Sequence, residues 1–326
     1  MRAASNRGLS ARTIALGSVV VLAGLAALNR QRALDAQRRY PPRGDFIRVR
    51  GVRLHKIDTG GPGPAVILLH GNGVTLADME ISGLVARAAR RRRVIAFDRP
   101  GFGYSERPRG TAWTPAAQAD LLAGALERME IEQAVVVGHS WGSMVALALA
   151  LDHPRLVQGL VLVSGYYFPT PRTDLPFFAP PAIPLIGDVL RCTIAPLIGQ
   201  LVKNSVIRKV FAPQRVPRRF SAEFPMGLSL RPGQIRASSE EFALMVPSAA
   251  ASAPRYMDLS IPVTIMAGTA DRISNPHRQS ARLHETIRHS HLILLPGIGH
   301  MLHHAAPDDV VDAIEAVGRR PGLSPV

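Results

Sequence analysis

Several short runs of this chain are continuously apolar and rich in valine, isoleucine and leucine. Such runs are typical of strands that are buried on both faces of a sheet. The sequence therefore predicts strands at residues 65–69, 94–97, 134–137, 160–163, 263–267 and 292–295. The alternating pattern of residues 48–58 instead predicts a hairpin that enters the sheet.

Helical spacing of apolar residues fills most of the intervals between these runs. The predicted helices cover residues 76–90, 115–129, 143–151, 276–286 and 308–317. Alternating strands and helices imply a mostly parallel sheet that is covered by helices on both faces. The expected fold class is therefore α/β.

The alternation stops between residues 166 and 255, where prolines interrupt apolar helical segments. Because this stretch separates two strands of the predicted sheet, we expect it to stand at one edge of the sheet and to cover the strand ends. We predict a helical cap, or lid, at residues 166–255, inserted into a core made of residues 45–165 and 256–320.

The amino-terminal segment is apolar but is bordered by arginines. No charged residue occurs from Thr13 to Leu28, and Arg12 and Arg30 flank this stretch. A helix of this length spans about 24 Å, a little less than the roughly 30 Å hydrocarbon core of a bilayer. We predict that residues 1–44 form a single-pass membrane anchor followed by a linker from residue 33. The alternative is a signal segment that is removed on export.

The chain has a formal net charge of +15, which raises the question of an anionic partner. Ten arginines lie within the first fifty residues, eight of them before the predicted core begins at residue 45, and aromatic residues are only 5% of the chain. We do not expect nucleic-acid binding, because no aromatic interleaving or nucleic-acid motif accompanies the basic residues. We interpret the four arginines at residues 90–93 as the solvated end of a helix.

The chain has a single cysteine, Cys192, which we interpret as a small buried side chain.

The strongest candidate for chemistry follows the predicted strand at residues 134–137. Gly138-His139-Ser140-Trp141-Gly142 lies between this strand and an alanine-rich helix, which is the context of a nucleophile elbow. The turn is sharp, so a side chain at either glycine would meet the neighbouring strand or helix, whereas Ser140 protrudes. We predict that Ser140 is a nucleophile.

Two upstream segments strengthen this interpretation. His-Gly-Asn-Gly at residues 70–73 and Asp-Arg-Pro-Gly-Phe-Gly-Tyr-Ser at residues 98–105 each follow a predicted strand. Together with the elbow, these segments resemble the α/β-hydrolase superfamily over roughly residues 48–317. The resemblance implies that the backbone N–H groups of Asn72 and Trp141 form the oxyanion hole.

A serine nucleophile needs a neighbouring imidazole as its base and a carboxylate to orient that imidazole. Asp271 follows the predicted strand at 263–267, and His300 follows the strand at 292–295, in the chain order of this superfamily. We predict that Ser140, Asp271 and His300 form a catalytic triad.

Other titratable residues near these positions have simpler interpretations. We expect His303 and His304 to be surface residues or to support the triad, and His139 to pack beside the elbow. Asp98 opens a turn, where aspartate commonly accepts backbone N–H groups. The His and Asp residues show no metal-binding spacing, so we expect neither a metal nor a cofactor.

The nucleophile limits the reaction class. Asn72 and Trp141 are similar to the pair that holds the halide in haloalkane dehalogenases, but those enzymes attack with a carboxylate, whereas this chain has Ser140. A serine forms an acyl-enzyme from a carbonyl compound. We predict a carboxylic-ester hydrolase, similar to carboxylesterases and lipases, that acts on a small hydrophobic acyl substrate. The alternatives are a carbon–carbon bond hydrolase, an acyltransferase or perhydrolase with the same triad, and an inactive membrane-tethered binding module.

Overall fold

A computed structural model describes residues 10–61 and 63–319 of the chain. These residues form an eight-stranded sheet in the order β1-β2-β4-β3-β5-β6-β7-β8. The strands are β1 (Asp45–Val49), β2 (Val52–Asp58), β3 (Ala65–Leu69), β4 (Arg93–Phe97), β5 (Ala134–His139), β6 (Val157–Val163), β7 (Val263–Gly268) and β8 (His291–Leu295).

The sheet is mostly parallel, as the sequence predicts. β1 and β2 form an antiparallel hairpin, β2 pairs antiparallel with β4, and every pair from β4 to β8 is parallel. The carboxyl ends of β5, β7 and β8 therefore lie at the same edge of the sheet. The three predicted triad residues follow these ends.

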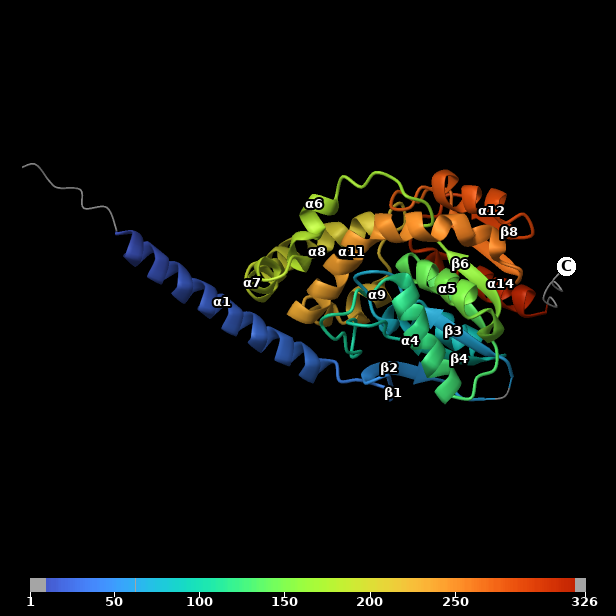
Figure 1. Cartoon of the computed structure of the whole chain (residues 1–326), viewed down its shortest axis with the longest axis horizontal. Helices are drawn as coiled ribbons and strands as arrows, with labels where there is room; N and C mark the ends of the chain where they lie inside the picture. Colours follow the sequence, from blue (N-terminus) through green and yellow to red (C-terminus); the bar gives the residue numbers. More distant parts are fainter. Residues whose placement is uncertain (1–9, 62, 320–326) are drawn as a thin grey trace, which may run out of the picture.

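Helices cover both faces of the sheet (Figure 1). The helices of the core, outside the insertion between β6 and β7, are α2 (Leu76–Ile81), α3 (Leu84–Ala88), α4 (Pro115–Arg128), α5 (Trp141–Asp152), α12 (Arg282–Thr286), α13 (Leu302–Ala305) and α14 (Pro307–Arg319). The predicted helix at 76–90 is divided in two, because Gly83 adopts a φ of 82° between α2 and α3.

Alternate residues of each central strand face two separate apolar clusters, as the period of a strand requires. In β3, Ile67 and Leu69 pack in the cluster that contains α4 and α5, whereas Val66 and Leu68 pack in the cluster that contains α2, α3 and α14. The burial of both faces explains why β3 is continuously apolar. The predicted α/β fold is confirmed.

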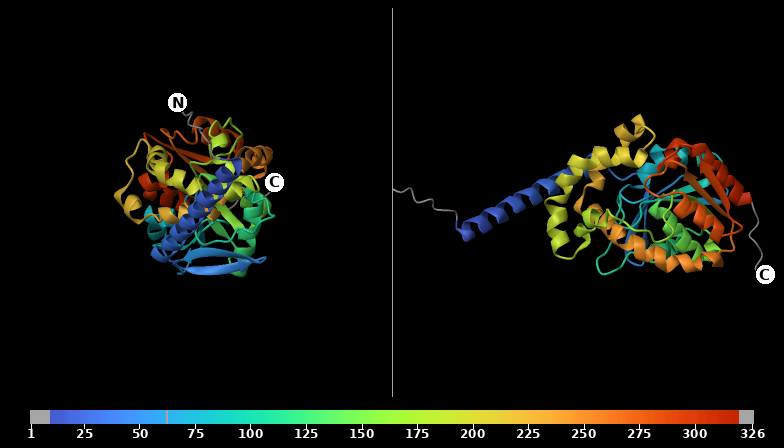
Figure 2. Two further views of the ribbon diagram at one scale, coloured as in Figure 1. Left: turned by 90° about the vertical axis from the view of Figure 1, so that its left-hand side faces the viewer. Right: turned by 90° about the horizontal axis from the view of Figure 1, so that it is seen from above.

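The segment between β6 and β7 is helical, in agreement with the predicted cap. We call residues 166–255 the cap. The helices in it are α6 (Leu175–Phe178), α7 (Ile186–Cys192), α8 (Ala195–Phe211), α9 (Arg218–Glu223), α10 (Met226–Ser229) and α11 (Pro232–Ser252). Two views show α11 running back along the α/β core while α7 and α8 extend away from it (Figures 1 and 2).

The predicted membrane anchor is wrong. Residues Ala11–Arg39 form one helix, α1, and among the described residues no helix is both long and apolar enough to cross a bilayer. The uncharged stretch is shorter than a bilayer core, and the same helix continues as a polar segment that packs on the cap. The buried Asn29 side chain donates to the carbonyl oxygens of Cys192 at 3.0 Å and Thr193 at 2.6 Å. The predicted single-pass anchor, and the membrane localisation that rests on it, are therefore overturned.

The predicted linker from residue 33 is also helical up to Arg39. Ala36 is buried, and α1 contacts α10 and α7 of the cap. Figure 2 shows the rest of α1 extending away from the body. Pro41 and Pro42 follow the end of the helix, which they cannot continue.

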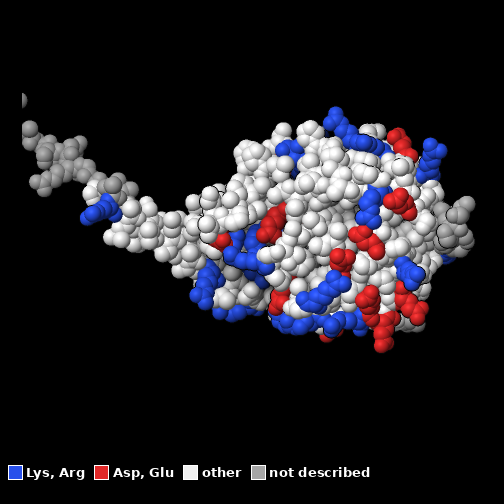
Figure 3. Space-filling view, in the orientation of Figure 1, with Lys and Arg blue, Asp and Glu red and all other residues white. Residues whose placement is uncertain are grey.

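Basic and acidic side chains are interspersed over the α/β body in the view of Figure 3. The arginine run at 90–93 is not simply a solvated helix end. Arg92 Nε lies 3.0 Å from Glu315 Oε1 in a largely buried ion pair, and Arg93 Nη2 lies 2.8 Å from Asp58 Oδ2. Arg92 and Arg93 are therefore engaged in ion pairs within the fold.

Candidate active site

Ser140 occupies a sharp turn between the end of β5 and the start of α5. Its backbone has a φ of 53°, which is unusual for a residue with a side chain and is typical of strained functional positions. A Cβ on Gly138 would lie 2.5 Å from the carbonyl oxygen of Gly142, and one on Gly142 would lie 2.2 Å from that of Leu69. Glycine is therefore required on both sides of the turn, as the sequence predicts.

The structure brings the three predicted triad residues together. His300 Nε2 lies 3.1 Å from Ser140 Oγ, and His300 Nδ1 lies 2.8 Å from Asp271 Oδ2. A carboxylate only accepts hydrogen bonds, so the proton of the neutral imidazole resides on Nδ1 and Nε2 accepts from the Ser140 hydroxyl. This is the arrangement in which a histidine can take a proton from a serine.

Asp271 is held in place from the other side. Its Oδ1 atom accepts hydrogen bonds from the backbone N–H groups of Ile273 at 2.8 Å and Ser274 at 2.9 Å. The Asp271 and His300 side chains are both buried. The carboxylate is therefore fixed in orientation, and it fixes the imidazole in turn.

The loop that carries Asn72 passes beside Ser140. A Cβ built on Gly71 would lie 3.2 Å from Ser140 Cβ, and Trp141 is the first residue of α5. Asn72 Nδ2 donates to the carbonyl oxygen of Ser238 at 3.0 Å, and Ser238 Oγ donates to Asn72 Oδ1. The Asn72 side chain is thus engaged by the cap, and its backbone N–H stays our prediction for one half of an oxyanion hole.

A buried arginine supports this loop, and sequence reasoning missed it. Arg99 donates from Nε to the carbonyl oxygen of His70 at 2.7 Å and from Nη2 to that of Gly71 at 3.0 Å. The same guanidinium pairs with Glu241 of α11, and neither side chain is exposed. Arg99 and Glu241 are far apart in the sequence, and no local sequence pattern links them.

Asp98 has a structural role, as we expect for an aspartate that opens a turn. Its Oδ1 accepts from the backbone N–H of Leu76 at 2.9 Å, and its Oδ2 accepts from that of Tyr104 at 3.0 Å. The Nδ1 atom of His55 lies 2.6 Å from Oδ2. Asp98 therefore fixes the turn after β4.

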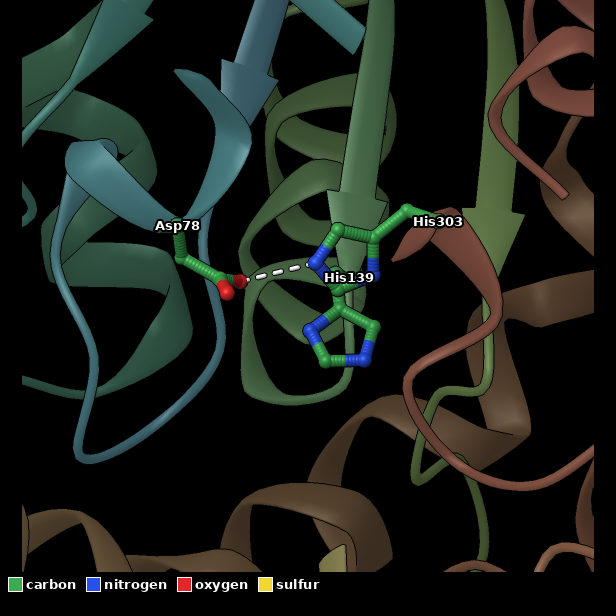
Figure 4. Close-up of side chains that lie close together, drawn as sticks. All are labelled: Asp78, His139 and His303. Carbon is green, nitrogen blue, oxygen red and sulfur yellow. Dashed lines mark hydrogen bonds and ion pairs between the residues drawn. The ribbon is translucent and has the colours of Figure 1, made fainter. Parts of the chain in front are cut away.

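A second group of titratable side chains lies behind the candidate triad. His303 and His304, which could have been surface residues, place their Nε2 atoms 2.8 Å from the two oxygens of Asp78, and Asp78 is fully buried. The His139 ring lies next to the His303 ring (Figure 4). Sequence reasoning missed Asp78, although a carboxylate within the apolar pattern of α2 is a signal for a buried partner.

Asp78, His139 and His303 are the described residues whose ligand atoms, all within 4.8 Å of one another, could hold a metal ion. Both carboxylate oxygens of Asp78 are already engaged by histidine donors. A hydrogen bond holds His303 against Asp78, and a ring contact places His139 beside His303.

Comparison with known proteins agrees with the α/β fold. A family model described as "alpha/beta hydrolase fold" matches residues 64–307. The 2-hydroxymuconate semialdehyde hydrolase of Pseudomonas sp. (strain CF600) is 40% identical over 139 residues, which cover 42% of this chain and 49% of that protein. The match thus spans about half the length of this relative, and the same holds for the corresponding hydrolase of Pseudomonas putida.

Longer matches extend over most of the chain. The 2-hydroxy-6-oxo-2,4-heptadienoate hydrolase of Pseudomonas putida (strain F1) is 29% identical over 259 residues, covering 76% of this chain and 85% of that protein. A thermophilic esterase from Thermogutta terrifontis superimposes with a TM-score of 0.67 at 23% identity, covering 84% of this chain and 97% of the esterase. At this identity the structural likeness shows the fold alone.

Proposed function

This chain belongs to the α/β-hydrolase family, and from that premise we propose that it is a serine hydrolase that cleaves carboxylic esters of hydrophobic acids through an acyl-enzyme. The observation that carries the proposal is the contact of Ser140 Oγ with His300 Nε2 at 3.1 Å, with Asp271 behind the imidazole at 2.8 Å.

In the first half-reaction, Ser140 Oγ attacks the carbonyl carbon of the ester while His300 Nε2 takes the hydroxyl proton. The carbonyl oxygen becomes an oxyanion, which the backbone N–H groups of Asn72 and Trp141 stabilise. The intermediate collapses, the bond to the alkoxy oxygen breaks, and His300 gives its proton to the departing alcohol. The acyl group remains on Ser140.

In the second half-reaction, His300 takes a proton from water, and the resulting nucleophile attacks the acyl carbon. Collapse of this second intermediate breaks the bond to Ser140 Oγ, and the proton on His300 returns to that oxygen. The products are an alcohol and a carboxylic acid, which loses a proton to solvent. Asp271 stays ionised throughout and stabilises the imidazolium in both halves.

The preference for a hydrophobic acid rests on the apolar composition of the cap, which covers the edge of the sheet where Ser140 lies. The test is a series of p-nitrophenyl esters from acetate to octanoate, with Ser140→Ala as the control. We expect kcat/KM to rise with acyl chain length and to vanish in Ser140→Ala. A preference for acetate would contradict the proposed acyl specificity.

A second candidate reaction is hydrolysis of a carbon–carbon bond beside a ketone, and the names of the Pseudomonas relatives favour it. It would use Ser140, His300 and Asp271 with a carbanion as the leaving group. The discriminating substrate is 2-hydroxymuconate semialdehyde, whose consumption can be followed by absorbance. Its turnover without hydrolysis of the ester series would replace the first proposal by the second.

A further inference from the structure

His139 lies directly before Ser140 in the sequence but contacts His300. Its side chain is buried, and its Nε2 atom lies 3.1 Å from the backbone carbonyl oxygen of His300. The centroids of the two imidazole rings are 5.0 Å apart. The residue that precedes the candidate nucleophile is therefore hydrogen-bonded to the main chain of the candidate base.

The hydrogen bond fixes the protonation of His139. A carbonyl oxygen only accepts, so Nε2 carries the proton and donates it. Burial lowers the pKa of His139 well below its usual value, and the nearby imidazoles of His303 and His300 act in the same direction. His139 is thus a neutral donor, and its Nδ1 atom has no hydrogen-bond partner among the described residues.

His303 contacts His139 and is itself held by Asp78. Its Nε2 atom lies 2.8 Å from Asp78 Oδ2, and its ring centroid lies 4.3 Å from that of His139. Figure 4 shows Asp78 on one side and the two imidazole rings, tilted relative to each other, beside it at the end of β5. Asp78 and His303 are both buried, and His139 packs against the His303 ring.

We propose that His139 is a positioning residue that sets the place of His300 relative to Ser140. The inference rests on the proposed function, since it requires His300 to be the base. The hydrogen bond joins the main chain of the base to the residue adjacent to the nucleophile, so it limits how far Nε2 can move from Oγ. A displacement of about 1 Å between reacting groups can reduce the rate about 10²-fold.

The test compares two substitutions in the full-length protein. In His139→Gln the amide Nε2 can still donate to the His300 carbonyl, whereas His139→Leu keeps a similar volume without any donor. We expect His139→Leu to lower both kcat for a p-nitrophenyl ester and the rate of fluorophosphonate labelling by about 10- to 100-fold, with KM unchanged. His139→Gln should recover most of this loss. The surface variant His277→Gln is the control and should behave as the wild type.

A spectroscopic measurement separates positioning from general loss of structure. The His300 Nδ1 proton, held by Asp271, should give a downfield proton NMR signal that persists in His139→Gln and broadens or shifts in His139→Leu. Rates are expressed per folded protein, so a role in stability alone would lower the melting temperature and leave these rates unchanged. That result would overturn the inference.

The two proposals fail in different ways. If the wild type is labelled at Ser140 and folded His139→Leu is labelled at the same rate, the positioning role is wrong while the serine hydrolase stands. If the folded wild type is not labelled at all, both are wrong. Should His139→Leu fail to fold, His139→Asn, whose shorter amide does not reach the carbonyl, replaces it in the same comparison with His139→Gln.

Discussion

Glu241 of the cap and Arg99 of the core form an ion pair in which neither side chain is exposed to solvent. Glu241 Oε2 lies 3.0 Å from Arg99 Nη2, and the same guanidinium donates to the carbonyl oxygens of His70 and Gly71. The cap helix α11 therefore holds the loop that carries Asn72. This part of the cap is a fixed component of the candidate active site.

Glu241→Gln should strongly destabilise the protein. The substitution leaves the Arg99 guanidinium buried without its anion, and breaking a buried pair in this way costs about 3–5 kcal/mol. Urea unfolding measures the loss. The matched control is Glu223→Gln, also in the cap, whose ion pair with Arg219 is more than half exposed and should contribute at most about 0.5 kcal/mol. Equal small losses in both variants would contradict the structural role of Glu241.

Gly142→Ala should destabilise the turn at Ser140. The new Cβ would lie 2.2 Å from the Leu69 carbonyl oxygen, a backbone atom that cannot move without disturbing β3. Such overpacking costs typically about 1–3 kcal/mol. Gly233→Ala in α11 is the control, because its Cβ would meet no atom within 4 Å and alanine favours a helix by up to about 1 kcal/mol. Thermal unfolding of the two variants gives the comparison, and a Gly142→Ala protein as stable as the wild type would contradict the geometry of the turn.

Protonation of His70 should oppose folding. Burial, reinforced by the nearby Arg99 charge, lowers the pKa of His70 to about 3. Its Nε2 atom accepts a hydrogen bond from the Arg99 backbone N–H at 3.0 Å, which a protonated ring cannot do. The unfolded chain takes up this proton near pH 6.5 and the folded protein does not, so the contribution of His70 to stability is present above pH 6.5 and is lost as the pH falls below it.

The expected slope is about 1.4 kcal/mol per pH unit for this group alone. Denaturant unfolding at pH 7, 6 and 5 should show that His70→Gln loses less stability on acidification than the wild type does. His277→Gln, which removes an exposed histidine, should keep the slope of the wild type. A slope that His70→Gln leaves unchanged would mean that His70 is protonated in the folded state.

The sequence predicts the central strands well because strands that are buried on both faces are continuously apolar. Both faces of β3 and of residues 134–137 in β5 are covered, so each of these positions is apolar and the runs stand out in the sequence. The elbow can be predicted from local sequence too. The glycines at 138 and 142 are required by close contacts within the same turn and with the adjacent strand. Asp271 and His300 follow strand ends that the same pattern locates.

The errors and omissions concern contacts between distant residues. Hydropathy alone favoured a membrane anchor at the amino terminus, whereas the Asn29 side chain bonds to carbonyl oxygens 163 and 164 residues further along the chain. The pairs Asp78 with His303 and Arg99 with Glu241 are likewise joined only by the fold. Periodicity carries no information on such pairs, so their discovery required the structure.

Fluorophosphonate labelling of the full-length protein tests whether Ser140 is an activated nucleophile. We expect one labelled serine, identified as Ser140 by peptide mass spectrometry, no labelling of Ser140→Ala, and labelling slowed by about 10³-fold or more in His300→Ala and Asp271→Asn. Each variant should retain the melting temperature of the wild type within a few degrees. A folded wild-type protein that remains unlabelled, or a Ser140→Ala protein that is labelled as fast, would contradict the serine hydrolase and favour a non-catalytic binding role for this fold.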